Sequence, residues 1–420
     1  MKSMTLTEPS LVDYQAFGIT RKAKGNTFIN DSIVVLFLLL ITNALFAPVL
    51  YDYQPDAVED SVPLKVLKYL PVVLIMLLNP KINFSYKKLT IADKLIITVG
   101  FFYIASAYWS PTSSDTLVNG LQYMVFMFFC YQLIYLKKLN IEWVLKTYLY
   151  IVISLSCLFY IAVPKWGRMA GFHQGLARGI FLHKNNLGSI LALLLPLALM
   201  EIKTLKGAIL TILMLGLIVL SGSSTSIVAA AGILVISTFV AWFDKRKAIF
   251  FVISMLGFAY FLFVNYYDKI LGLLGKSAEL TGRTLLWENI MIAIKQKPLL
   301  GWGYWGFWKS QSKLSTFAHM KWEAGKAHDA FLAVALSGGV VLLGIVIVWM
   351  LFIFLQILSI KDTKSRSYSL LVFFGIFALC FTEIGLVEHN DIFLFVLLFA
   401  SKPGASDTTD YFAIKLETAS

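Results

Sequence analysis

The sequence predicts an all-α integral membrane protein with about 12 transmembrane helices and a long periplasmic loop that contains short interfacial helices. Hydrophobic residues make up 58% of the chain and charged residues only 14%, with a mean hydropathy of +0.76. Soluble domains are roughly one-quarter charged. Apolar stretches near the length that crosses a bilayer recur along the chain, and the connecting segments alternate in charge. These observations exclude the water-soluble classes.

The predicted spans are separated by short polar connections. They cover 32–50, 65–79, 93–109, 117–136, 142–163, 186–202, 206–221, 225–243, 248–267, 330–358, 368–385 and 390–401. Three basic residues, Arg21, Lys22 and Lys24, stand just before the first span, and no small-x-small cleavage site follows them at the right place. We therefore interpret the first span as an uncleaved signal-anchor. This divides the chain into segments 1–31, 32–267, 268–328, 329–401 and 402–420.

Charge in the connecting segments predicts the topology. The acidic segment 52–60 falls on one side of the membrane, and the groups on the other side are basic: Lys81, Lys87, Lys88, Lys137, Lys138, Lys203, Lys206, Lys245, Arg246, Lys247, Lys361, Lys364 and Arg366. Cytoplasmic loops carry the excess of Lys and Arg, so both termini are predicted to be cytoplasmic. The net charge of +12 is thus largely used to anchor the spans, and no nucleic-acid partner is expected. Cys130, Cys157 and Cys380 lie in apolar runs and predict neither a disulfide framework nor a zinc site.

The loop 268–328 breaks this charge rule. The topology places it outside the cell, yet it carries nine basic residues against four acidic ones: Lys269, Lys276, Arg283, Lys295, Lys297, Lys309, Lys313, Lys321 and Lys326 against Asp268, Glu279, Glu288 and Glu323. Positive charge on the outer side predicts an anionic partner at the outer leaflet. Attraction to anionic lipid headgroups, worth about 1 kcal/mol per residue near the surface, is the alternative explanation.

A second outward segment, 164–185, has no acidic residue. Its basic residues are Lys165, Arg168, Arg178 and Lys184, and His183 stands directly before the next span. Cations often snorkel at a helix end, but this segment has more hydrogen-bond donors in a short stretch than snorkelling explains. Arg168, Arg178, His183 and Lys184 are therefore candidate substrate-binding residues.

Within the long loop, residues 281–294 predict a surface helix that ends before Pro298. Leu286, Ile290, Ala293 and Ile294 form an apolar stripe at spacings of three and four. Such a helix would lie along the membrane surface. Arg283 stands in its first turn, where a phosphate would meet both the guanidinium group and the positive end of the helix dipole. A plain surface arginine is the alternative.

Aromatic residues follow the predicted surface helix. Trp302, Trp305 and Trp308 would share one face if this segment were helical. Their rings could stack on sugars, but tryptophans also anchor proteins at the lipid–water boundary. The sequence alone favours the anchoring role.

His328 opens the span that follows the long loop. A histidine at a helix entrance beside cations can serve as a general base, because its pKa lies near working pH. The alternative is an interfacial polar residue. Asp329 either caps the helix or orients the imidazole, and Gly338 and Gly339 lie within the same span.

Taken together, these features resemble the O-antigen ligase and Wzy-type polysaccharide polymerase superfamily. The resemblance covers roughly residues 90–400. It rests on the span pattern and on Gly282-Arg283, Trp287, Lys297-Pro298-Leu-Leu-Gly-Trp-Gly and His328-x9-Gly338. The segments Phe181-Leu-His-Lys-Asn-Asn-Leu-Gly188 and Trp109-Ser110-Pro111 are more similar to its exopolysaccharide polymerase branch. The chain departs from many relatives in having Asp329 after His328.

The resemblance implies a glycosyltransferase of the bacterial inner membrane whose 268–328 loop is catalytic and faces the periplasm or exterior. The donor would be a glycan on undecaprenyl diphosphate, and the acceptor a glycan or lipid-linked hydroxyl. Arg283 and Arg178 would grip the diphosphate with help from Lys184, and His328 would be the general base; Arg168 is the other candidate for the upstream arginine. No carboxylate pair suited to a metal stands in the basic loops, so we expect neither metal nor cofactor.

Two other functions remain open. An O-antigen ligase would transfer a finished glycan to lipid A-core or to protein, whereas a polymerase would transfer the growing chain to the next repeat unit. A secondary transporter or flippase is a more remote alternative, because transporters use ionisable residues inside their spans and the predicted spans hold almost none.

Overall fold

The computed structural model describes residues 25–44, 62–79, 89–135, 139–240, 247, 250, 283–317, 325–381, 383, 386, 388 and 391–402. Across these ranges the regular structure is helical, apart from one isolated antiparallel bridge between Arg168 and Ala177. The α-helices are α1 Gly25–Ile41, α3 Val62–Leu78, α4 Ile91–Ala105, α5 Ser113–Tyr135, α6 Ile141–Ala162, α7 Pro164–Gly167, α8 Lys184–Leu199, α9 Leu205–Ser221, α10 Ser224–Phe239, α13 Arg283–Gln296, α14 Gln311–Phe317, α15 Ala330–Leu358, α16 Thr363–Cys380 and α17 Ile392–Ala400.

Every predicted span within the described ranges coincides with a helix, and the span 248–267 lies almost wholly outside them. Four helical stretches in the described part are long and apolar enough to cross a membrane: Ile91–Tyr108, Ser113–Ile134, Ile141–Ala162 and Ala330–Leu358. Shorter apolar helices accompany them. The chain is therefore a multi-pass membrane protein, and the total of about 12 spans stays a prediction.

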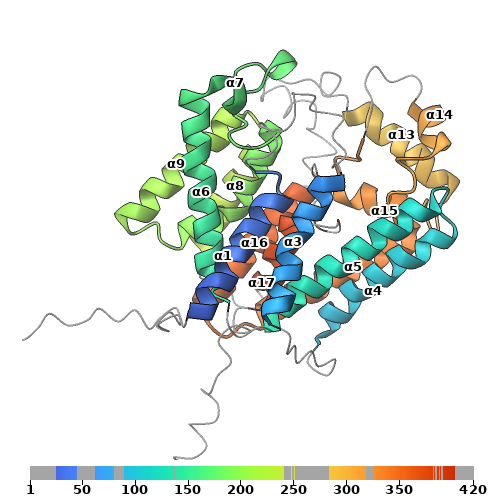
Figure 1. Ribbon diagram of the computed structural model, residues 1–420, viewed down its shortest axis with the longest axis horizontal. Helices are drawn as coiled ribbons and strands as arrows, with labels where there is room; N and C mark the ends of the chain where they lie inside the picture. Colours follow the sequence, from blue (N-terminus) through green and yellow to red (C-terminus); the bar gives the residue numbers. More distant parts are fainter. Residues whose placement is uncertain are drawn as a thin grey trace, which may run out of the picture.

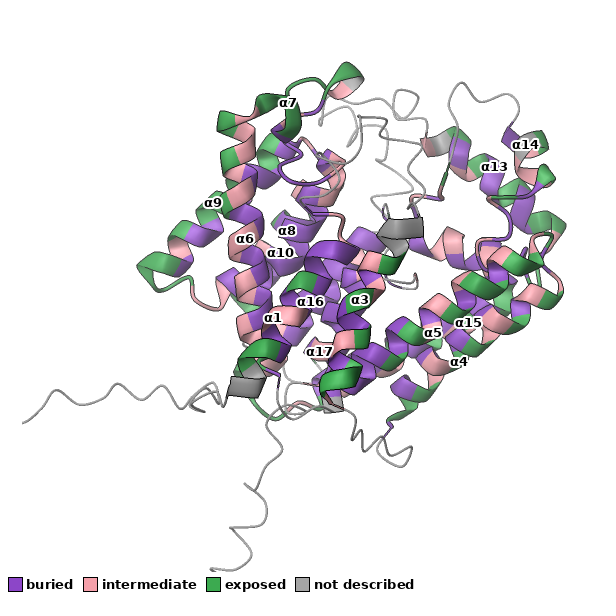
Figure 2. Cartoon of the chain, in the orientation of Figure 1, coloured by how far each residue is buried: buried purple, intermediate pink, exposed green. Residues whose placement is uncertain are grey.

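The helices form two flanks around a central group (Figure 1). Helix α8 packs against α9, α10 and α16, whereas α4 packs against α5 and α15. Figure 2 shows that the central α16 and α17 are mostly buried, whereas the outer helices keep one exposed face. Ile212 of α9 and Phe101 of α4 are among the exposed apolar residues. A helix that is apolar all round belongs in the interior, and the exposed apolar faces are suited to lipid.

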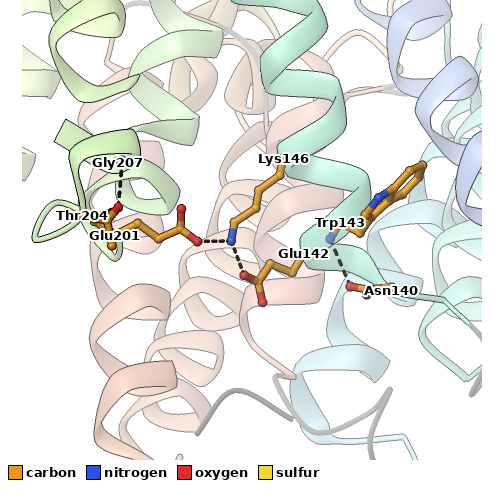
Figure 3. Close-up of polar contacts among 7 residues, drawn as sticks. All are labelled: Asn140, Glu142, Trp143, Lys146, Glu201, Thr204 and Gly207. Atoms are coloured by element: carbon orange, nitrogen blue, oxygen red, sulfur yellow. Dashed lines mark hydrogen bonds and ion pairs between the residues drawn. The ribbon is translucent and has the colours of Figure 1, made fainter. Parts of the chain in front are cut away.

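Polar side chains fix several helix ends. Thr90 and Asp93 form a capping box at the start of α4, and Asn140 caps α6 by accepting from the Trp143 backbone N–H at 3.0 Å. Lys146, one turn into α6, pairs with Glu142 and with Glu201 in the connection after α8 (Figure 3). This triad joins α6 to the start of α9, at the end where the sequence places basic connecting segments.

Helix α15 is broken where the sequence predicts one continuous span. Gly339 has φ 63° and ψ −161°, a backbone conformation that only glycine adopts readily. Residues 298–303 fill the break: the backbone N–H groups of Trp302 and Gly303 donate to the carbonyls of Leu336 and Ser337 at 2.9 Å, and Val340 N–H donates to Pro298 at 2.8 Å.

Glycine is also required at the break for space. A Cβ added at Gly339 would lie 2.2 Å from the Leu299 carbonyl oxygen, and one at Gly301 would lie 2.6 Å from the backbone nitrogen of Gly338. Broken helices are tolerated in membrane proteins where neighbouring protein satisfies the freed backbone groups. Residues 298–303 and the first part of α15, which follows His328, are therefore one connected unit.

Candidate functional site

Helix α13 presents Arg283 at its first residue and buries the opposite, apolar stripe. Leu286, Ile290 and Ala293 are fully buried and Ile294 nearly so, in a small second core with Trp302, Phe307 and Phe317. The apolar stripe predicted from the sequence is confirmed, but it packs against other parts of the protein, and the predicted position along the membrane surface stays a prediction. This packing fixes the helix axis and leaves the half-buried Arg283 at its N-terminal end, where backbone N–H groups and the helix dipole favour anions.

Trp287, one turn after Arg283, connects α13 to the segment that holds His328. Its indole N–H donates to the carbonyl oxygen of Ala327 at 3.1 Å. His328 itself has φ 52°, which is uncommon for a residue with a side chain and persists only where its surroundings enforce it. Trp287 thus links the helix that begins at Arg283 to the backbone directly before His328.

His328 and Asp329 have different roles. The Asp329 carboxylate caps α15 by accepting from Leu332 N–H at 2.7 Å, so the N-cap interpretation is confirmed. Burial raises the pKa of Asp329 to about 6, against the backbone hydrogen bonds that lower it. The Nδ1 atom of His328 is buried and has no hydrogen-bond partner among the described residues. Buried polar atoms without a partner are rare in proteins. A role of His328 as a proton acceptor would explain this one.

The shorter outward loop is held by its own arginines. Arg178 is buried and donates from Nε to the Trp166 carbonyl at 2.8 Å and from Nη2 to the Lys165 carbonyl at 3.2 Å. Arg168 donates to the Tyr160 carbonyl at 3.1 Å and lies over the Tyr160 ring. Both guanidinium groups therefore hold the backbone of this loop in place.

The end of the shorter loop is tied to the helices behind it. Lys184 is buried, and its Nζ donates to the Gly222 carbonyl at 3.1 Å. His183 caps α8: its Nδ1 accepts from the Asn185 backbone N–H at 3.2 Å. The His173 ring lies edge-on to His183, with ring centroids 5.8 Å apart.

Electrostatics links four residues of the two loops, which we call the histidine–cation cluster: His183, His328, Arg283 and Lys326. Burial is the main cause that holds the pKa of His328 well below its usual range, and Lys326, Arg283 and His183 lower it further. Burial lowers the pKa of His183 to about 3, followed by the charges of Lys184, His173, Lys326 and Arg283. Residues about 145 positions apart in sequence thus share one electrostatic environment.

Arg283 and Lys326 bring two positive charges to the cluster. Within the part of the chain that the structure describes, no carboxylate forms an ion pair with either side chain. Lys326 lowers the pKa values of Glu388 and Asp391, but burial has the larger effect in the opposite direction. The pKa of Glu388 is raised to about 8 and that of Asp391 to about 6. Asp391 is engaged as the N-cap of α17. The histidine–cation cluster is therefore positively charged and suited to bind a negatively charged ligand.

The tryptophans of the long loop do not share a helix face, because residues 298–309 form turns. Trp302 is buried, donates to the Ala293 carbonyl at 2.9 Å and carries the Lys297 ammonium over its ring. Trp308 stacks on Phe317. Trp305 is half-buried with φ 61°. Packing of the loop accounts for Trp302 and Trp308.

Sequence reasoning missed Lys326 as a member of the site's surroundings, whereas it named Glu388 in an acidic group that could pair with the basic loops. Lys326 was one cation among nine in its loop, with nothing to distinguish it except its place two residues before His328. Glu388 belongs to an acidic group with Glu383, His389 and Asp391; His389 lies outside the described residues. The sequence thus indicated a general pairing of this group with the basic loops, and the electrostatic effect of Lys326 on Glu388 required the structure.

Comparisons with known proteins identify similarity over part of the chain. A family profile described as O-Antigen ligase (Wzy_C) matches residues 209–347. The resemblance to the O-antigen ligase family is thereby confirmed. The stretch matched to this family includes Arg283, Lys326 and His328, whereas Arg178, His183 and the rest of the shorter loop precede it.

A curated relative extends the similarity. The chain is 32% identical over 172 residues to the exopolysaccharide production protein ExoQ of Rhizobium meliloti (strain 1021). The similar region covers 37% of this chain and 39% of that protein. The chain thus matches about two-fifths of the length of this curated relative.

Proposed function

We propose that this chain is a glycosyltransferase that acts at the outer face of the bacterial inner membrane and polymerises exopolysaccharide or O-antigen repeat units. The donor is a glycan on undecaprenyl diphosphate, and the acceptor is a hydroxyl of a second, lipid-linked glycan. The observation that carries the proposal is the histidine–cation cluster, in which Lys326, Arg283 and His183 act electrostatically on His328, and Trp287 links the helix of Arg283 to the segment of His328. The family profile and the name of the curated relative support the substrate class.

In the proposed reaction, Arg283 and Lys326 neutralise the diphosphate of the donor. Arginine binds phosphate with two parallel hydrogen bonds, which a lysine cannot do. The imidazole of His328 accepts the proton of the acceptor hydroxyl as its oxygen attacks the anomeric carbon. The bond from that carbon to the diphosphate oxygen breaks, and the lipid diphosphate leaves with the bonding electrons. A single displacement of this kind inverts the anomeric centre, and fixed cations aimed at the leaving group stabilise its growing charge.

The perturbed pKa of His328 suits this role. Because burial and cations disfavour the imidazolium, the free site holds a neutral imidazole that can accept a proton. A bound diphosphate brings negative charge that opposes Arg283 and Lys326 and raises the pKa of His328 again. The base is therefore strengthened when the substrate is present.

The remaining candidate residues take supporting roles in this scheme. Arg178 and Arg168 hold the shorter loop through backbone carbonyls, and Lys184 ties its end to Gly222. We therefore assign Arg178 to positioning, with its charge adding to the field of the site. Trp302 is buried and anchors the loop through the Ala293 carbonyl, and Trp305 is half-buried.

The distribution of lipid-linked glycans tests the proposed function. In a strain that lacks this chain, we expect single lipid-linked repeat units to accumulate and long polymer to disappear. Accumulation of long lipid-linked chains would instead identify an O-antigen ligase, the second candidate favoured by the description of the family profile. Unchanged glycans together with lost vesicle uptake of a solute would contradict both and support a transporter or flippase.

A further inference from the structure

One ring nitrogen of His183 is engaged in the cap of α8. Nδ1 accepts a hydrogen bond from the Asn185 backbone N–H, 3.2 Å away, at the N-terminus of α8. A ring nitrogen accepts only through a free lone pair, so Nδ1 carries no proton. In the neutral imidazole the proton therefore resides on Nε2, which becomes a donor.

The surroundings keep this ring neutral. A second proton would have to enter at Nδ1, where it would face the N–H of Asn185 and abolish the helix cap. It would also add positive charge at the positive end of α8, next to Lys184, Lys326 and Arg283. The same arrangement that caps the helix thus selects one tautomer of His183.

The two histidines of the cluster consequently differ in chemical capacity. His183 has its only lone pair engaged in the cap, so it can donate but cannot accept a proton. His328 has an Nδ1 with no partner among the described residues and no comparable constraint. One imidazole is built as a donor and the other is left able to act as a base.

We propose that His183 is a neutral hydrogen-bond donor whose Nε2–H contacts a phosphoryl oxygen of the bound lipid diphosphate beside Arg283. This inference rests on the proposed function for the identity of the ligand. A neutral donor adds orientation to the phosphate without adding a third full charge to Arg283 and Lys326. The diphosphate product is then held firmly in one pose and still able to leave.

Replacing His183 by glutamine or by asparagine separates its function as a hydrogen-bond donor from its function as a helix cap. The side-chain nitrogen of His183→Gln reaches the place of Nε2 but supplies no cap acceptor at the place of Nδ1. The side-chain oxygen of His183→Asn takes the place of Nδ1, and asparagine is among the best N-cap residues, but its amide group ends short of Nε2. If His183 were only a helix cap, asparagine would be the better replacement.

Binding of undecaprenyl diphosphate to the purified full-length chain in detergent measures the difference. We expect His183→Gln to bind within a few-fold of wild type and His183→Asn to bind about 10- to 100-fold more weakly, as for a lost hydrogen bond to a charged group. The melting temperature should follow the opposite order, because only asparagine keeps the cap. Asparagine binding as tightly as glutamine, or more tightly, overturns the donor assignment.

Binding by the wild-type protein distinguishes a failure of the donor assignment from a failure of the proposed function. If wild type does not bind undecaprenyl diphosphate, the proposed substrate class is wrong and the donor assignment falls with it. If wild type binds and His183→Asn matches or exceeds His183→Gln, only the donor assignment is wrong.

Discussion

Replacing His328 by asparagine is expected to reduce polymer synthesis by about 100- to 10,000-fold, the contribution of a general base, while the protein stays in the membrane. Asparagine is the informative replacement because it tolerates a positive φ, and His328 has φ 52°. The backbone before α15 is then retained, and only the proton acceptor is lost. His328→Ala serves as a second variant that lacks any polar group. Polymer length and amount in washed membranes, normalised to the amount of protein, provide the measurement.

The pH dependence of the wild-type rate accompanies this prediction. An unperturbed histidine with a pKa of about 6.5 would lose its base function as pH falls through that value. Burial, Lys326, Arg283 and His183 lower the pKa of His328, so the free protein keeps a neutral imidazole at more acidic pH. We expect kcat/KM to stay level between about pH 7.5 and pH 6, and kcat, which reports the bound state, to show its inflection at higher pH.

Substantial polymer made by His328→Asn would contradict the assignment of the base.

Replacing Arg283 by lysine is expected to reduce synthesis by about 10- to 100-fold although the charge is preserved. The guanidinium group supplies a planar pair of donors to a phosphate, and the ammonium group supplies a single point charge. The loss of one charged hydrogen bond accounts for this range. Arg366→Lys is the matched control, because Arg366 stands near the start of α16 and donates to the Ile360 carbonyl. Synthesis at the wild-type level in Arg283→Lys would instead support general attraction to lipid headgroups.

The positions of the helices along the chain were largely predictable from sequence, because they depend on local composition. Apolar stretches located the helices within a few residues, and the apolar stripe of α13 predicted its buried face, with Leu286 and Ile290 fully buried. Asp329 followed the rule for N-caps. Each of these features is decided by neighbours a few positions away along the chain.

Features that depend on distant contacts were not predictable. The break in α15 at Gly339 exists because residues 298–303 fill it with backbone hydrogen bonds; the glycine pair at 338–339 and Gly301 and Gly303 were the signals available. The same contacts bury Trp302, which the sequence left between lipid anchoring and sugar stacking.

The candidate site was predicted in its parts, and its assembly required the structure. Arg283, His183 and His328 were each selected from local density of donors, but nothing in the sequence stated that the two loops share one electrostatic environment. The use of Arg178 to hold backbone carbonyls was equally hidden, because an arginine in a basic loop has the same appearance in either role.

The central claim is that the histidine–cation cluster faces the outside of the cell. Cysteine labelling tests it most directly, in a chain whose Cys130, Cys157 and Cys380 are replaced by alanine. Lys295 of α13 and Lys361, between α15 and α16, are both exposed and suit replacement by cysteine. With a membrane-impermeant maleimide on intact spheroplasts, we predict that Lys295→Cys is labelled at once and Lys361→Cys only after the membrane is disrupted. The reverse pattern would place Arg283 and His328 in the cytoplasm and contradict the proposed function.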